Sequence, residues 1–80
     1  MQQELDIHVH IDEDADETTA FLQLNLRGEH FEALGRAKRN PVDRPMPVVG
    51  EELAMARALS NLTSQVMDAA QNKIEQFLSV

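Results

Sequence analysis

Two histidines near the start of the chain are the side chains best suited to hold a metal ion. His8 and His10 lie two residues apart, and Asp6 and Asp12 flank them. Residues two apart in an extended strand share a face, so both imidazoles could ligate one metal ion. Two ligands on an exposed strand are more often a solvated polar surface. His8 and His10 are therefore candidate metal ligands only, and we expect no bound metal or other cofactor.

The other reactive side chains do not form a catalytic pattern. Five acids lie between residues 12 and 17, in a segment whose composition predicts a loop, where water screens their charges. No serine has a histidine near it in the sequence, and the three glycines are too far apart to form a phosphate-binding loop. We therefore expect a protein without enzymatic activity.

Length and composition limit what the chain can build. Eighty residues, of which 42% are hydrophobic and three are aromatic, allow a single domain, residues 1–80, with a thin aliphatic core. Association with a second copy would relieve that shortage. Because the chain has no cysteine, it can form neither disulfides nor thiolate metal sites, which fits a reducing compartment.

Charge and hydropathy narrow the range of partners. The net charge is −7, and residues 1–17 hold seven acids and no Lys or Arg. Such a chain repels polyanions, which argues against double-stranded RNA or an anionic membrane as the partner. No apolar run approaches the roughly 18 residues of a membrane span, and residues 1–4 lack the features of a signal peptide. We expect a cytoplasmic protein.

The apolar pattern predicts three antiparallel strands in the order 1-2-3. Apolar and polar residues alternate from Leu5 to Ile11 and again from Ala20 to Leu26, as in half-buried strands. After Phe31, the third strand would place the small residues Ala33, Gly35 and Ala37 on its inner face, so a helix can approach closely. The strands are expected at about residues 4–12, 18–27 and 30–39.

A glycine sets the expected register of the second hairpin. Gly28 suits the first central position of a type II′ turn between Arg27 and His30. This turn would pair Leu26 with Phe31.

The proline-rich residues 40–49 predict a crossing loop, because proline is excluded from helix interiors and central strands. A helix is expected at about residues 50–70, starting at Gly50, with a tail helix or extension at 71–79. Lys73 interrupts the apolar stripe that would cover the sheet, so the helix should overrun the sheet or break near residues 70–72. That stripe is formed by Met55, Leu59, Leu62, Val66 and Ala69.

Two surfaces remain for partners. On the outer face of the sheet the predicted register makes Phe21 and Leu34 diagonal neighbours, and places His10, Phe21 and Arg36 in one row. The expected partner face on that side consists of Phe21, Leu34, Arg36 and Lys38. A second helical stripe and the tail form the expected homodimer interface, which consists of Leu53, Ala56, Met67, Ile74, Phe77 and Leu78.

A polar pair is expected to join the loop to the helix. Asp43 lies in the proline-fixed loop and Arg57 at the second turn of the helix. The Arg57 guanidinium could donate hydrogen bonds to loop carbonyls and to the Asp43 carboxylate. We expect the two residues to interact, in a structural rather than catalytic role.

Two segments carry a resemblance to a known family. Residues 39–43 read RNPVD, and residues 47–62 read PVVGEELAMARALSNL. This pattern resembles the signature of a family of short actinobacterial proteins of unknown function that includes dormancy-induced mycobacterial proteins. The resemblance implies a fold like a double-stranded-RNA-binding domain reduced to β-β-β-α, found as a homodimer, with a likeness to ribosome hibernation factors. RNA-binding residues do not carry over, because Glu51 and Glu52 stand where such a module has lysines.

The sequence therefore predicts an α+β domain in which one long C-terminal helix covers a three-stranded antiparallel sheet. The expected function is a non-catalytic, homodimeric binding or stress-response protein, with itself and the ribosome or another protein as partners. The alternative is a metal- or small-ligand-binding domain that uses His8 and His10.

Overall fold

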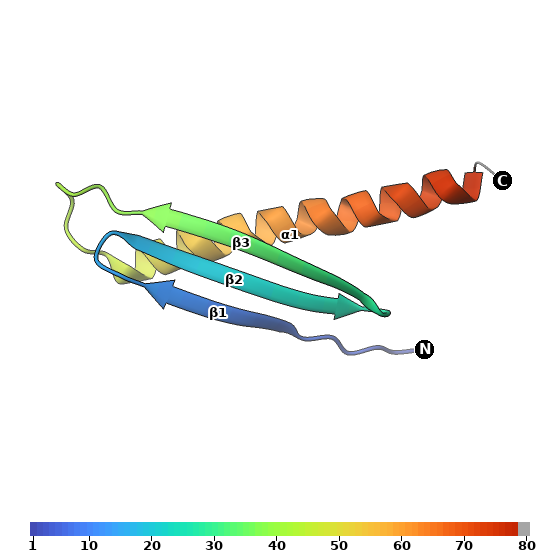
Figure 1. Cartoon of the computed structure of the whole chain (residues 1–80). Coiled ribbons are helices and arrows are strands. Elements are labelled where there is room, and N and C mark those ends of the chain that lie inside the picture. The colour runs from blue at the N-terminus through green and yellow to red at the C-terminus, as the bar shows by residue number, and fades with distance from the viewer. Residues whose placement is uncertain (79–80) are drawn as a thin grey trace.

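The computed structural model describes residues 1–78, which form one sheet and one helix. The elements in chain order are β1 (Ile7–Glu13), β2 (Glu17–Leu26), β3 (Glu29–Lys38) and α1 (Pro47–Leu78). The sheet is antiparallel with the order β1-β2-β3, and α1 lies across one face of it (Figure 1). The predicted α+β class and strand order are confirmed. No helix of these residues has the length and apolar character to cross a membrane.

The first hairpin has the register that its alternating residues predict. Val9 lies opposite Leu22, and His10 lies opposite Phe21. Because side chains alternate between the two faces of a strand, the apolar set shares the inner face and the polar set the outer face. The buried core is formed by Ala20, Leu22, Leu24, Phe31, Ala33, Ala37, Ala54, Ala58 and Leu62.

The second hairpin corrects the predicted register by two residues. Leu26 pairs with Glu29, so the turn has only Arg27 and Gly28 at its centre. Both have positive φ, 49° and 80°, which is the type I′ geometry whose twist matches the flanking strands. The predicted type II′ turn is therefore wrong, and Phe31 lies opposite Leu24. Every side chain keeps its face, because the shift is an even number of residues.

Close packing between helix and sheet depends on Gly35. A Cβ atom built on Gly35 would collide with the backbone of Ala54 and Ala58, so α1 passes directly over this residue. The helix therefore presents its alanines to the sheet. This rotates α1 away from the predicted orientation, in which Leu59 faced the sheet. Leu59 is instead 41% exposed.

The helix starts earlier than predicted, and its C-terminal part follows the alternative in which it overruns the sheet without a break. It begins at Pro47 rather than Gly50, since proline fits the first position of a helix, and Gly50 N donates to Met46 O at 3.1 Å. No break occurs at residues 70–72, and the helix continues to Leu78. Lys73 is accommodated where α1 passes the β2–β3 turn, with its Nζ 2.6 Å from Glu29 Oε1. The end of the predicted tail, residue 79, lies outside the described residues.

Candidate functional site

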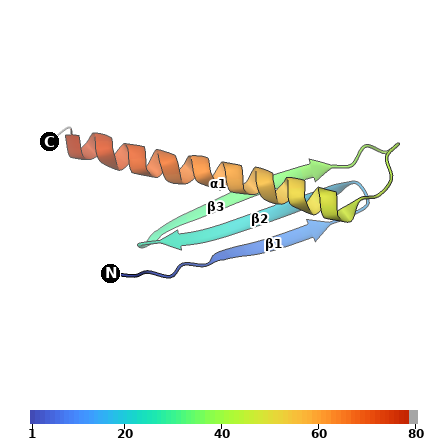
Figure 2. The ribbon, with the colours of Figure 1, turned by 180° about the vertical axis from the view of Figure 1, so that it is seen from behind.

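The inner face of β1 is apolar and largely uncovered. The residues of β2 and β3 that form the core are at most 9% exposed. On β1 and the segment before it, Leu5, Ile7, Val9 and Ile11 are 38% to 49% exposed. Figure 2 shows the reason: α1 lies over β2 and β3, and β1 runs clear of it along most of its length. The sheet thus has a bare apolar strip, formed by these four residues, beside the helix.

A ladder of side chains from α1 ties the helix to the far edge of the sheet. Arg57 Nη1 donates to Arg36 O at 2.7 Å. One helical turn later Asn61 Nδ2 donates to Leu34 O at 3.3 Å, and after another turn Gln65 Nε2 donates to Glu32 O at 2.6 Å. Four helical residues rise about 6 Å, close to the roughly 6.6 Å of two strand residues, so the two spacings match.

This ladder has two consequences for the sheet. Because the carbonyls of the β3 edge accept hydrogen bonds from the helix, that edge offers less to another strand. Because the helix is held over β3, it cannot also cover β1. The other edge of the sheet, formed by β1, stays open, and it lies on the same side of the molecule as the bare apolar strip.

Sequence reasoning predicted the apolar face of β1 but missed that it is uncovered. The polar residues Arg57, Asn61 and Gln65 recur every four positions beside the apolar stripe. That periodicity was the available signal, since it marks the flank of the helix that meets a strand edge.

The residues predicted to form the dimer interface all lie exposed on α1. The exposed fractions are 44% for Leu53, 61% for Met67 and 53% for Ile74, and Ala56 is also exposed. At the end of the helix, Phe77 and Leu78 are 83% and 75% exposed. The single chain thus leaves apolar surface on the helix as well as on β1.

The outer face of the sheet carries a smaller apolar patch. His10, Phe21 and Leu34 lie in one row across the three strands. Phe21 and Leu34 are therefore directly opposite, not diagonal as predicted, because the second hairpin is shifted. Phe21 is half-buried and Leu34 is 39% exposed.

The basic residues of the predicted partner face lie beside this patch. Arg36 pairs with Thr19 in the next row rather than sharing the row of Phe21, and Lys38 lies opposite Glu17. Arg36 Nε is 3.8 Å from Glu17 Oε1, and most of the Arg36 side chain is exposed. The four residues therefore share one face, with an apolar centre and a basic end.

The two candidate metal ligands lie on this same outer face. His10 Nε2 is 3.2 Å from Asp12 Oδ2, and His8 lies opposite Gln23. Within residues 1–78, no group of three or more His, Cys, Asp or Glu side chains is arranged to hold a metal ion. The third histidine, His30, serves a surface network, with Nδ1 2.7 Å from Asn25 Oδ1.

The hydrogen bonds of that network also lower the pKa of the Glu32 carboxyl group. His30 Nε2 is 2.9 Å from Glu32 Oε1, and Gln23 Nε2 donates to the same oxygen at 3.4 Å. These hydrogen bonds, chiefly the one from His30, lower the pKa of Glu32 because they favour its charged form. The Glu32 carboxylate is held ionised on the surface, and the geometry gives it a structural role.

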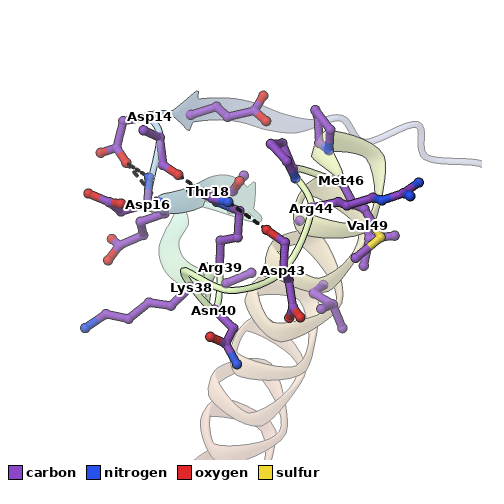
Figure 3. Close-up of a pocket in the computed structure, with 18 residues that line it drawn as sticks. Asp14, Asp16, Thr18, Lys38, Arg39, Asn40, Asp43, Arg44, Met46 and Val49 are labelled. Carbon is purple, nitrogen blue, oxygen red and sulfur yellow. Dashed lines mark hydrogen bonds between the residues drawn. The ribbon is translucent and has the colours of Figure 1, made fainter.

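A pocket of about 310 Å³ lies at the end of the sheet where the β1–β2 loop, residues 39–46 and the start of α1 converge (Figure 3). Arg39 braces this junction: its Nε donates to Ala15 O at 3.0 Å and its Nη1 to Asp43 O at 2.9 Å. Asp14 Oδ1 accepts bonds from the backbone of Asp16 and Glu17, both at 2.8 Å. The contacts that line the pocket thus hold two loops together, and we assign it no ligand.

The predicted contact between Asp43 and Arg57 is replaced by two others. The guanidinium that reaches Asp43 belongs to Arg39, and it binds the backbone carbonyl of Asp43. Arg57 instead donates to Arg36 O. The prediction chose the wrong arginine, because Arg57 lies on the flank of α1 that faces β3.

Comparison with known proteins places the chain among mycobacterial relatives. It is 38% identical over 69 residues to the uncharacterized protein Rv2632c of Mycobacterium tuberculosis, covering 86% of this chain and 74% of that protein. It is 36% identical, over the same length, to the uncharacterized protein Mb1767 of Mycobacterium bovis, covering 73% of that protein.

Comparison of structures relates the chain to the same mycobacterial protein. The crystal structure of Rv2632c superposes with a TM-score of 0.88 at 34% sequence identity, covering 95% of this chain and 90% of that one. A family model described as Rv2632c-like matches residues 3–80. The chain therefore belongs to the Rv2632c-like family.

Proposed function

We propose that this protein is a non-catalytic homodimeric binding protein of the stress or dormancy response, which acts by docking on a larger assembly. The observation that carries the proposal is the bare apolar strip of β1. An exposed apolar surface of this kind is typical of a protein that functions in contact with another molecule.

The energetics support self-association. Four large aliphatic side chains on the bare strip are each about two-fifths exposed. Burying the exposed part of each would add roughly 1–2 kcal/mol of hydrophobic stabilisation, at about 25 cal/mol per Å². A domain of this size has a stability of only about 4–12 kcal/mol, so this unused burial is substantial. The sheet is covered on one face by a single helix, and the molecule is only 15 Å thick along its shortest axis. A second copy supplies the missing layer.

The outer face of the sheet is the surface proposed for the larger partner. Its apolar centre, Phe21 and Leu34, suits a protein contact. Arg36 and Lys38 at one end favour an acidic neighbour despite the net negative charge of the chain. The family resemblance makes the ribosome, through a protein or a mixed surface, the first partner to test. No geometric observation favours the alternative of a metal site at His8 and His10.

The experiment is cosedimentation of the purified protein with ribosomes from starved cells of the source organism. We expect the wild type to sediment with ribosomes, and the binding to weaken as salt rises. The double variant Phe21→Ser, Leu34→Ser should not bind ribosomes but should remain a dimer. Asn25→Ser, on the same face but two rows from the apolar centre and on the side away from Arg36 and Lys38, is the matched control. Absence of cosedimentation at low salt would contradict the ribosome as partner, and a monomeric wild type would contradict the dimer.

A further inference from the structure

We infer that two copies assemble as a three-layer sandwich, with the two helices side by side between the two sheets, in which the α1 of each copy covers the bare β1 strip of the other. This inference rests on the proposed homodimer and specifies its interface. It unites two surfaces that the single chain leaves exposed, the apolar strip of β1 and the flank of α1 turned away from its own sheet.

The helix carries an apolar stripe suited to this role. Its members recur at intervals of three and four residues, so they lie within about a quarter of the helix circumference. Leu59, Met67, Ile74 and Phe77 are between 41% and 83% exposed. We call this set the outward stripe, and it consists of Leu59, Thr63, Met67, Ala70, Ile74 and Phe77.

The hydrogen bonds from α1 to the β3 edge show that the outward stripe and the bare strip occupy the same positions along the strand direction. Arg57 bonds to β3 in the row of Asp12, and Gln65 bonds to β3 in the row of His8. At the other end, Lys73 reaches Glu29 beside the β2–β3 turn, beyond the row of Ile7. Helix residues from 57 to 73 therefore run alongside β1 and the segment before it, in the direction from Asp12 towards Leu5.

In the proposed dimer, the two copies are related by a two-fold axis parallel to the strands. Rotation about such an axis leaves the position of each residue along the strand direction unchanged. The axis turns the second sheet over and sets the two helices side by side in a middle layer. Met67 of one copy then lies level with Ile7 of the other, and Thr63 lies level with Val9. Leu59 and Ala70, on the side of the stripe nearer β1, lie towards the neighbouring helix. The interface is isologous, as a two-fold dimer requires.

The exposed apolar area is sufficient for a stable dimer. If a fully exposed large apolar residue presents about 200 Å² and these are about half exposed, they contribute roughly 800 Å² per copy, the share of a standard interface. The residues counted are Leu5, Ile7, Val9, Ile11, Leu59, Met67, Ile74 and Phe77.

The competing arrangement pairs the open β1 edges of two copies into a six-stranded sheet. That arrangement would bring Val9 of the two copies close together. It would leave the apolar strips bare between two separated helices, and it would not use the outward stripe. The sandwich covers both surfaces, and it places the two β1 strands in different layers.

Cysteine cross-linking tests the sandwich, because the native chain has no cysteine. The variants are Ile7→Cys, Met67→Cys and Val9→Cys, each checked for native circular dichroism and for sedimentation mass. Ile7→Cys and Met67→Cys proteins are refolded together and treated with a short bifunctional thiol reagent. Covalent dimer is read on a denaturing gel. Each single variant treated alone is the matched control.

The sandwich predicts covalent dimer in the Ile7→Cys and Met67→Cys mixture and little or none in any single variant. Efficient cross-linking of Val9→Cys alone would overturn it in favour of edge pairing. A sedimenting dimer that gives no covalent product in the mixture would overturn the sandwich and leave the homodimer standing. A monomer in sedimentation would overturn both.

Discussion

Replacing Gly35 by alanine tests the account of how the helix packs on the sheet. The added Cβ would overlap Ala54 O and Ala58 N and lie 2.9 Å from Ala58 Cα. All three are backbone atoms, so no side-chain rotation relieves the collision and α1 must move outward. Overpacking usually costs about 1–3 kcal/mol. Because the displaced segment carries the buried residues Ala54 and Ala58, we expect a loss at the upper end of that range, about 3 kcal/mol, in the free energy of unfolding.

The measurement is urea unfolding followed by far-ultraviolet circular dichroism, at one fixed protein concentration because dimerisation adds to the apparent stability. Gly50→Ala is the matched control. Its Cβ would meet the Thr18 side chain, with Oγ1 at 2.9 Å, which can rotate, and alanine favours a helix by about 1 kcal/mol over glycine. We expect Gly50→Ala to stay within about 1 kcal/mol of the wild type. A Gly35→Ala variant as stable as Gly50→Ala would refute the reasoning.

Three further predictions concern polar contacts. Asn61→Ala should cost about 0.5–1.5 kcal/mol in urea unfolding and increase light scattering on storage, because a carbonyl of the β3 edge is freed; unchanged scattering would argue against edge protection. The hydrogen bond from His30 lowers the pKa of Glu32, so this carboxylate stabilises the fold above the ordinary glutamate pKa. The stability difference between wild type and Glu32→Gln should therefore shrink as the pH falls through the lowered pKa, and a difference independent of pH would contradict this. A double-mutant cycle of Asp43→Asn and Arg57→Gln should give a coupling energy near zero, and measurable coupling would show that the two side chains meet.

The strands and their faces could be predicted from the sequence because alternation is local information. The register of β2 and β3 could not be fixed in the same way. A glycine permits either a type I′ or a type II′ turn, and the two differ by a shift of two residues that keeps every face unchanged. The outer-face rows were therefore misplaced, although the set of residues on that face was correct.

The face of α1 that contacts the sheet could not be predicted from apolar periodicity alone. The largest apolar residues define the predicted stripe, but α1 is oriented by the smallest ones, since only Ala54 and Ala58 can pass over Gly35. The Asp43 contact failed for a related reason, because the rotation carries Arg57 to the β3 edge. The uncovered strip of β1 follows from how many strands one helix can cover, which is a property of the assembled fold.

The central claim is that the apolar strip of β1 is covered by a second copy of the chain. Sedimentation equilibrium of the wild type and of Val9→Glu at micromolar concentration tests it most directly. The account predicts that the wild type has twice the 9.0 kDa mass of the chain and that Val9→Glu, with a native circular dichroism spectrum, has the mass of a monomer. A wild type that sediments at 9.0 kDa, or a Val9→Glu variant that remains fully dimeric, would contradict the claim.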